Sequence, residues 1–355
     1  MSACVCVCVC VSRSQVQPLP QCGDQVNGIL PANGAMASHS RTTVGLSTGC
    51  HPMAPLSALP EYSPTEDLQT SWAVVNSAHR GAKRRCFSWQ FGSWNVRSLL
   101  DNERPIETAR QGPECHQLAE DRRIDLVVRE LNRYNITVAA LQKTKWFGEA
   151  TYRVGESFVV LTAGRPTPQA NQSKQRGEGV AIVLGGPAVA AWKMGGEQWR
   201  TWGSRLIRVT LAIGKGASDS LHVFSCYAPT YAASREAKDD FFDDLQRALD
   251  EVPPEESLVL LGDFNACVGS RNKGDDPWEG VRGPHGMGEV NEAGRDLVNF
   301  LLLNEATIYN TWFQKMIHKQ TWQHPKSKQW HCIDFAVVHH RDRERCLGCC
   351  SKTGS

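Results

Sequence analysis

The sequence predicts an α/β fold in which two mixed sheets pack face to face with helices outside them, a four-layer α/β/β/α sandwich. Three observations predict it. From about Phe87, short apolar runs bounded by turn residues recur along the chain, as is typical of buried strands. Most runs follow one another as in hairpins, and only a few helical stretches intervene, which disfavours a simple parallel array. The chain has 355 residues, 41% of them hydrophobic, which is enough for a large core.

Periodicity and turn residues define the individual elements. Three stretches predict helices because their apolar residues recur three and four positions apart: residues 118–134, a stretch that begins after the N-cap Ser234 and ends near Glu251, and residues 293–303. The other elements are short apolar or aromatic runs, which predict strands. In chain order, these strands cover residues 87–94, 136–141, 157–162, 179–184, 205–213, 221–227, 257–261, 320–323 and 332–338.

The first 86 residues differ from the rest of the chain. Cysteine and valine alternate over Cys4–Val11, and residues 18–64 are rich in Pro, Gly, Ser, Thr and Ala with little hydrophobic periodicity. Such a composition predicts a disordered, low-complexity leader over residues 1–86. It lacks the basic start and the small-residue cleavage site of a signal peptide, so secretion is not predicted. We expect one domain over residues 87–348 and a tail over residues 349–355.

Composition and charge exclude some classes of protein. The 39 Lys and Arg residues nearly balance the 37 Asp and Glu residues, so the chain is no polycation that binds nucleic acid by bulk charge. No apolar run approaches the roughly 20 residues of a membrane helix. The 14 Cys residues follow no regular framework, which favours reduced thiols in an intracellular protein. Cys346-x-x-Cys349-Cys350 is a weak metal motif, and Lys83-Arg84-Arg85 is either a solvated boundary or a nuclear import signal.

Polar residues stand at the ends of, or within, three of the apolar runs. Asn95 follows the first predicted strand, and Asp334 lies inside the last one. Asp263 and Asn265 follow the strand over residues 257–261, and their spacing of two places both on one face. Carboxylate and amide groups at strand ends are typical ligands of Mg²⁺ and of the phosphate oxygens around it. The alternative is an Asx-type turn at Asp263 and a structural ion pair at Asp334.

Six short motifs carry a resemblance to known proteins. The motifs, in chain order, are Trp94-Asn95-Val96-Arg97, Leu141-Gln142-x-Thr144-Lys145-Trp146, Tyr227-Ala228-Pro229, Gly262-Asp263-Phe264-Asn265, Gln320-Thr321-Trp322 and Ile333-Asp334-Phe335. With these motifs in this order, the chain resembles the endonuclease/exonuclease/phosphatase superfamily, and within it the endonuclease domain of non-LTR (LINE-type) retrotransposons and the derivatives called craniofacial development protein 2-like. The resemblance covers roughly residues 88–348.

The resemblance implies Mg²⁺-assisted hydrolysis of a phosphodiester, which retrotransposon enzymes use to nick target DNA. It implies that Asn95 holds the scissile phosphate or the metal, and that Tyr227 contacts phosphate through its hydroxyl. Asp263 would orient the attacking water, and Asn265 would donate a hydrogen bond to the phosphate as charge develops. Asp334 would orient a catalytic histidine.

Three departures from the family pattern concern the metal, the histidine and the phosphate. Lys143 stands where the family has a metal-binding Glu, and an ammonium group repels Mg²⁺. No Asp-His pair follows Asp334, so we expect the C-terminal strand that carries this pair to be missing. Arg97 stands where some members carry an acid, and a guanidinium binds phosphate but no metal. We expect Arg97 and Lys143 to bind phosphate or DNA. Thr321 and Trp322 are expected to support the site and its nucleic-acid face.

The sequence thus predicts a retrotransposon-derived, Mg²⁺-dependent endonuclease domain that acts on DNA inside the cell. Its cleavage activity is expected to be impaired by Lys143 and by the absent Asp-His pair. One alternative is a non-catalytic relic that binds nucleic acid or protein. The other is a phosphatase of the same fold, which depends on the same Glu and His and is weakened equally by the departures.

Overall fold

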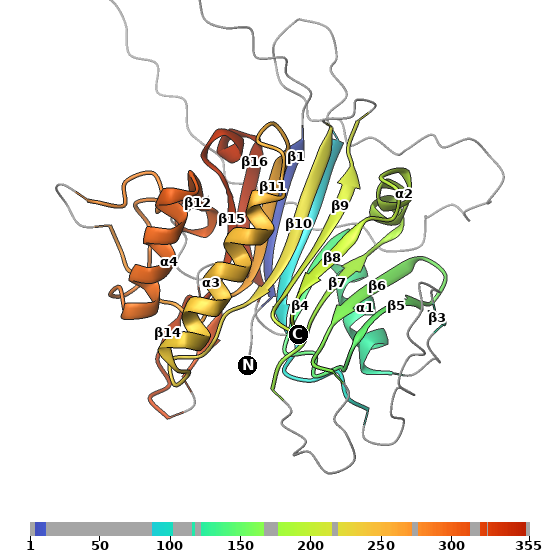
Figure 1. The fold of residues 1–355 in the computed structure, drawn as a ribbon, viewed down its shortest axis with the longest axis horizontal. Helices are drawn as coiled ribbons and strands as arrows, with labels where there is room; N and C mark the ends of the chain where they lie inside the picture. The colour runs from blue at the N-terminus through green and yellow to red at the C-terminus, as the bar shows by residue number, and fades with distance from the viewer. Residues whose placement is uncertain are drawn as a thin grey trace, which may run out of the picture. The chain divides into compact units, whose positions relative to one another are not determined.

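Two mixed sheets, one of eight strands and one of six, form the framework of the protein in the computed structural model (Figure 1). The structure describes residues 4–11, 87–101, 116–117, 122–166, 177–214, 219–271, 276–312, 320–324 and 326–352. These residues all belong to one unit, which comprises Met1–Ser12 and Ala73–Ser355. Within these ranges, no helix combines the length and the apolar character that crossing a membrane requires.

The eight-stranded sheet runs, in spatial order, through β16 (Cys346–Lys352), β1 (Cys4–Val11), β2 (Phe87–Asn95), β4 (Val138–Gln142), β7 (Val180–Leu184), β6 (Phe158–Ala163), β5 (Glu149–Val154) and β3 (His116–Gln117). Strands β2 and β4 are parallel, whereas β4, β7, β6 and β5 pair as antiparallel neighbours. Helix α1 (Arg123–Arg133) covers this sheet, because its apolar stripe packs with residues of β4, β5, β6 and β7.

The six-stranded sheet runs through β12 (Ala306–Ile308), β15 (Asp334–His339), β11 (Ser257–Asp263), β10 (Ser220–Tyr227), β9 (Leu206–Ala212) and β8 (Trp199–Trp202). Helix α3 (Arg235–Asp250) connects the parallel strands β10 and β11. The Oγ of Ser234 accepts a hydrogen bond from the N–H of Ala237 at 3.3 Å, which confirms the predicted N-cap. Helix α4 (Glu292–Leu303) precedes β12, and β13 (Trp322–Gln323) pairs with β14 (Trp330–His331). Short 3₁₀ helices cover Tyr309–Trp312 and His340–Arg345.

Three apolar clusters show how the layers stack. The central cluster joins Trp89 and Phe91 of β2 to residues of β9 and β11, such as Val209 and Val259, so the two sheets face each other. A second cluster lies between the six-stranded sheet and helices α3 and α4, and the third lies between the eight-stranded sheet and α1. The order of layers is therefore helix, sheet, sheet, helix, which confirms the predicted four-layer architecture.

Some predicted elements differ from the observed ones. The predicted helix over residues 118–134 is observed as Arg123–Arg133, and residues 118–121 lie outside the described residues. Helix α2 (Gly186–Met194) was not predicted because its small apolar residues form no helical stripe. Strand β5, next to the edge strand β3, and the edge strand β8 were also missed, since charged residues interrupt the apolar residues of both. The predicted strand over residues 320–323 is reduced to Trp322–Gln323.

The two ends of the described chain require a correction. The leader over residues 1–86 was expected to be disordered, but Cys4–Val11 forms strand β1 between β2 and β16. Alternating valines at every second position suit a strand, because β-branched residues favour extended backbone. The tail expected over residues 349–355 lies largely in β16, which ends at Lys352 and carries no Asp-His pair. Residues 12–86 lie outside the described residues.

Candidate functional site

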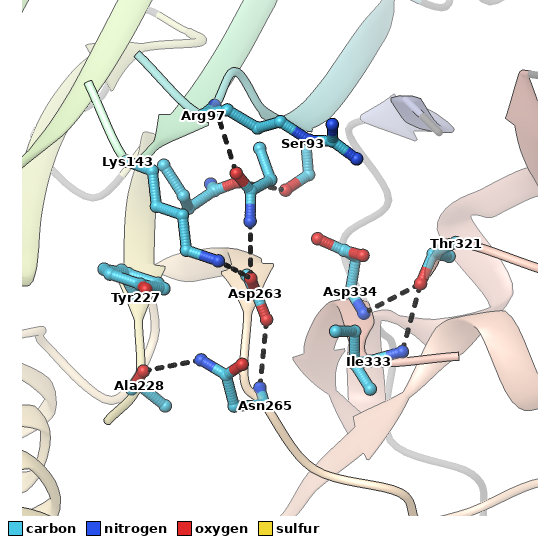
Figure 2. A network of polar contacts seen from close by, with 12 residues as sticks. Ser93, Arg97, Lys143, Tyr227, Ala228, Asp263, Asn265, Thr321, Ile333 and Asp334 are labelled. Carbon is cyan, nitrogen blue, oxygen red and sulfur yellow. Dashed lines mark hydrogen bonds and ion pairs between the residues drawn. The ribbon is translucent and has the colours of Figure 1, made fainter. Parts of the chain in front are cut away.

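Four strand ends meet at one edge of the sandwich. Strand β2 ends at Asn95, β10 ends at Tyr227, and β11 ends at Asp263, while β15 begins at Asp334 directly opposite Asp263. Lys143 follows the last residue of β4. Because the parallel pairs β2–β4 and β10–β11 finish at this edge, residues far apart in sequence become neighbours. Figure 2 shows Lys143 and Asp263 turned toward one another beside Tyr227, with Asp334 on the far side of Asp263.

Asp263 is the centre of this site and is fully buried. Its Oδ2 accepts a hydrogen bond from Asn95 Nδ2 at 2.7 Å and lies 3.7 Å from the Nζ of Lys143. Its Oδ1 accepts a hydrogen bond from the N–H of Asn265 at 3.1 Å. Burial raises the pKa of Asp263, and the Lys143 ammonium and the two hydrogen bonds oppose this effect. Three donors thus stabilise the ionised carboxylate of Asp263.

Asp334 differs from Asp263 because its carboxylate is poorly satisfied. The side chain is 3% exposed, and its Oδ1 has no hydrogen-bond partner. Its backbone N–H donates to Thr321 Oγ1 at 3.3 Å. Burial, followed by the negative charge of Asp263, raises the pKa of Asp334 well above its usual range. The site therefore holds a buried oxygen atom that can still accept or share a proton or meet a donor from a ligand.

Lys143 is held in place by its backbone as well as by Asp263. Its φ of 58° lies in the left-handed region, which is unusual for a residue other than glycine. Backbone hydrogen bonds hold the next residue, Thr144. Its N–H donates to the carbonyl of Gly179, and its carbonyl accepts from the N–H of Leu99. The Lys143 side chain keeps 29% of its surface exposed, so its ammonium group borders both the buried carboxylates and solvent.

A cluster of polar side chains around Glu178 holds Tyr227 in place on the side of its ring opposite Lys143. The Glu178 carboxylate accepts hydrogen bonds from Arg165 Nε at 2.7 Å, Ser204 Oγ at 2.6 Å and Arg205 Nη2 at 2.8 Å. Arg205 in turn donates to the carbonyl of Tyr227 at 3.1 Å and lies 5.1 Å from the centre of its ring. These contacts hold Tyr227 between Arg205 and the ammonium of Lys143, which lies 5.1 Å from the same ring.

Sequence reasoning missed Glu178 and Arg205. They lie 27 positions apart and belong to none of the motifs above. Only the packing of the two sheets brings β7 of one sheet close to β9 and β10 of the other, so no local signal in the sequence could have found Glu178 and Arg205.

Replacing Glu178 by Gln is expected to weaken folding at neutral pH. The arginines and Ser204 lower the pKa of Glu178 to about 2, against burial, from a reference value of 4.5. A carboxyl group with a depressed pKa stabilises the fold above its unfolded pKa and loses that effect as the pH falls toward 2. This pKa shift corresponds to about 3 kcal/mol of folding stability. Solvent screening of the partly exposed Arg165 reduces the expected loss to roughly 2 kcal/mol. Chemical unfolding at several pH values measures this, and equal loss at pH 7 and near pH 2 contradicts it.

The remaining predicted residues lie around the same edge. Asn265 has a φ of 48° and donates from Nδ2 to the carbonyl of Ala228 at 2.8 Å. Arg97 is exposed, and its N–H donates to Asn95 Oδ1 at 3.2 Å. Thr321 is fully buried and accepts from the N–H groups of Ile333 and Asp334 (Figure 2). The half-buried Trp322 packs its ring against His324 and His331.

The structure thus brings Asn95, Tyr227, Asp263, Asn265 and Asp334 to one place, with Lys143 among them. Thr321 supports Asp334 through the backbone, while the contacts of Arg97 and Trp322 with nucleic acid stay predictions.

The residues of this site do not fit a magnesium ion. Mg²⁺ requires oxygen ligands in near-octahedral geometry and favours carboxylates. Here the ammonium of Lys143 is beside Asp263, and the amide nitrogen of Asn95 takes the same carboxylate oxygen. Nowhere in the described ranges do three or more His, Cys, Asp or Glu residues group so as to hold a metal. The unpartnered Oδ1 of Asp334 is the one feature that favours a cation, and Lys143 already supplies positive charge nearby.

Comparisons with known proteins found similar sequences and solved structures of similar fold. No family model matches the chain. It is 27% identical to Craniofacial development protein 2 of Bos taurus over 277 residues, which are 76% of this chain and 40% of that protein. The chain therefore spans about two fifths of the length of this relative.

Two solved structures are similar in fold. The endonuclease domain of TRAS1, a telomere-specific non-LTR retrotransposon, is 13% identical with a TM-score of 0.36, over 61% of this chain and 78% of that one. The catalytic domain of Xenopus laevis APE2 is 14% identical with a TM-score of 0.41, over 72% of this chain and 83% of that one.

Proposed function

We propose that the chain is a retrotransposon-derived domain of the endonuclease/exonuclease/phosphatase fold that binds the phosphate backbone of DNA and is impaired in cleaving it. Its similarity to Craniofacial development protein 2 and its two-sheet architecture support this proposal. The observation that carries this proposal is the position of Lys143. Its ammonium lies 3.7 Å from the buried Asp263, at the place where the resemblance implies a metal-binding Glu.

Lys143 can replace part of the charge of a metal ion. An ammonium carries three donors, and one of them faces Asp263. The partly exposed side chain leaves donors for a phosphate oxygen that enters from solvent. Arg97 lies exposed on the loop after β2 and adds a second positive charge near Asn95. Two cations at one strand edge favour a phosphodiester as the ligand.

The same contacts oppose hydrolysis. A general base must be free to accept a proton from water, but Asp263 is held by Lys143, Asn95 and the N–H of Asn265. Asp334, which the resemblance pairs with a catalytic histidine, has an Oδ1 without a hydrogen-bond partner. Because the lone pairs of Asp263 are already taken, the site is poorly equipped to activate water, and Lys143 is left to bind phosphate.

Changing Lys143 to Ala is expected to weaken binding of a labelled DNA oligonucleotide about tenfold and to lower the salt dependence by about one phosphate contact. Fluorescence polarisation at several salt concentrations measures both quantities. Lys193→Ala is the matched control, because Lys193 is an exposed lysine on α2. The proposal fails if the two variants bind DNA equally well.

Cleavage is tested separately by plasmid nicking with Mg²⁺. We expect no nicking above that of the Asp263→Ala variant. Nicking that needs Asp263 would instead support an active endonuclease.

A further inference from the structure

The segment that leaves β10 is tied to the site by its backbone. The N–H of Ala228 donates to the carbonyl of Asp263 at 2.9 Å. The carbonyl of Ala228 accepts from Asn265 Nδ2 at 2.8 Å (Figure 2). Tyr231 follows three residues later. Because each residue spans at most about 3.6 Å, Tyr231 lies within about 14 Å of Tyr227 along the chain. Any ligand held at Lys143 that extends by a few nucleotides can therefore reach Tyr231.

Tyr231 presents a large aromatic ring to solvent from a fixed turn. Its side chain is 75% exposed. The turn is closed by the N–H of Ala233, which donates to the carbonyl of Thr230 at 3.0 Å, and α3 begins two residues later behind its Ser234 cap. The backbone that carries the ring is thus held between two anchored elements, so it need not be ordered when a ligand binds.

A cation lies over this ring. The Nζ of Lys238, one turn into α3, is 5.5 Å from the centre of the Tyr231 ring. The other large exposed apolar residues in the described ranges are aliphatic and offer no ring: Leu126 on α1, Met194 on α2, and Leu302 and Leu303 on α4. An exposed aromatic ring next to a lysine is the pair of groups that binds a nucleobase and its phosphate in single-stranded nucleic acid.

We propose that Tyr231 and Lys238 form a stacking platform for an unpaired base of a nucleic-acid strand whose phosphate lies at Lys143. This inference rests on the proposed function and adds to it the class of substrate, namely single-stranded DNA or DNA with unpaired bases. The base stacks on the ring face that Lys238 leaves open, and the Lys238 ammonium meets a neighbouring phosphate. A regular duplex offers no such base, because its bases are stacked on one another inside the helix.

Polarisation measurements on three labelled DNA ligands test the platform. The ligands are a short single strand, the matching duplex, and a strand of the same charge whose central nucleotides lack bases. Tyr231→Ala is expected to weaken binding of the single strand about tenfold, while Tyr231→Phe, which keeps the ring, stays within about twofold. Leu303→Ala is the control for loss of an exposed apolar side chain.

Two further readouts separate stacking from a structural effect. The baseless strand is expected to bind the unchanged protein as weakly as the normal strand binds Tyr231→Ala. The duplex is expected to bind Tyr231→Ala and the unchanged protein equally. Lys238→Ala is expected to lower the salt dependence, whereas Tyr231→Ala leaves it unchanged.

The outcomes distinguish this inference from the proposal it rests on. If Lys143→Ala weakens binding but Tyr231→Ala does not, the platform is wrong and the phosphate site stands. If Tyr231→Ala weakens the duplex and the baseless strand as much as the normal strand, stacking is wrong. If neither Lys143→Ala nor Tyr231→Ala changes binding, both the platform and the phosphate site are wrong.

Discussion

Replacing Lys143 by Glu is expected to make the stability of the protein depend on Mg²⁺. In the absence of Mg²⁺, the change removes the only positive side chain that contacts Asp263 among the described residues and puts a negative charge beside this carboxylate. An uncompensated charge at a buried carboxylate costs about 3 to 5 kcal/mol. With the cation, the new carboxylate and Asp263 supply oxygen ligands that Mg²⁺ prefers, so binding to the folded state restores stability.

Thermal unfolding in EDTA and in Mg²⁺ measures this effect. The matched control is Lys143→Gln, which loses the charge but gains no carboxylate, and its stability should not respond to Mg²⁺. The unchanged protein should respond as little as this control, because its ammonium opposes a cation. A melting temperature of the Glu variant that is the same in EDTA and Mg²⁺ would show that residue 143 does not occupy a cation position.

Replacing Asp334 by Asn is expected to stabilise the protein at neutral and alkaline pH. The Asp334 carboxylate is buried beside Asp263, and its Oδ1 has no partner, so ionisation is opposed in the folded state. A group whose folded pKa is raised favours folding below its unfolded pKa and loses that contribution as the pH rises through the folded value. Asn carries no charge, so it avoids this loss. We therefore expect a gain in the free energy of unfolding near pH 8 that disappears as the pH falls toward the reference pKa of 3.8.

Unfolding by denaturant at several pH values follows this difference. Asp276→Asn is the matched control, and we expect it to change the free energy of unfolding in the opposite direction. Asp276 is also buried, but its carboxylate accepts two hydrogen bonds from the buried Arg282 at 3.1 Å. Its replacement should destabilise the protein, because it leaves a buried guanidinium without its charge partner. If Asp334→Asn also destabilises at pH 8, its carboxylate has a partner in the folded protein.

A stabilising change at Asp334 would have a functional meaning. Proteins keep unfavourable groups where a ligand uses them, and most other positions are free to lose them. The contrast between Asp276, which is fully paired, and Asp334, which is not, supports placing the ligand site at the edge where β11 and β15 meet.

Several elements were predictable because their signals are local. The Ser234 cap and the apolar stripe after it are contained in one stretch of chain, and α3 begins where they indicate. Buried strands such as β10 and β11 are short apolar runs whatever their partners. Helix α2 and strand β5 gave no such signal, because α2 is apolar around much of its surface and β5 lies near an edge with charged residues. Their structures depend on neighbours rather than on their own pattern.

The sequence by itself determined the two-sheet fold and the residue types of the site, because strand periodicity and the six motifs are written in consecutive residues. Tertiary structure alone decided that the ammonium of Lys143 contacts Asp263 across 120 positions of chain and that Asp334 lies opposite with one oxygen unpaired. It also decided that Glu178 and Arg205 hold Tyr227 from behind. Distances and hydrogen bonds between strands depend on register and burial, which arise only when the two sheets pack.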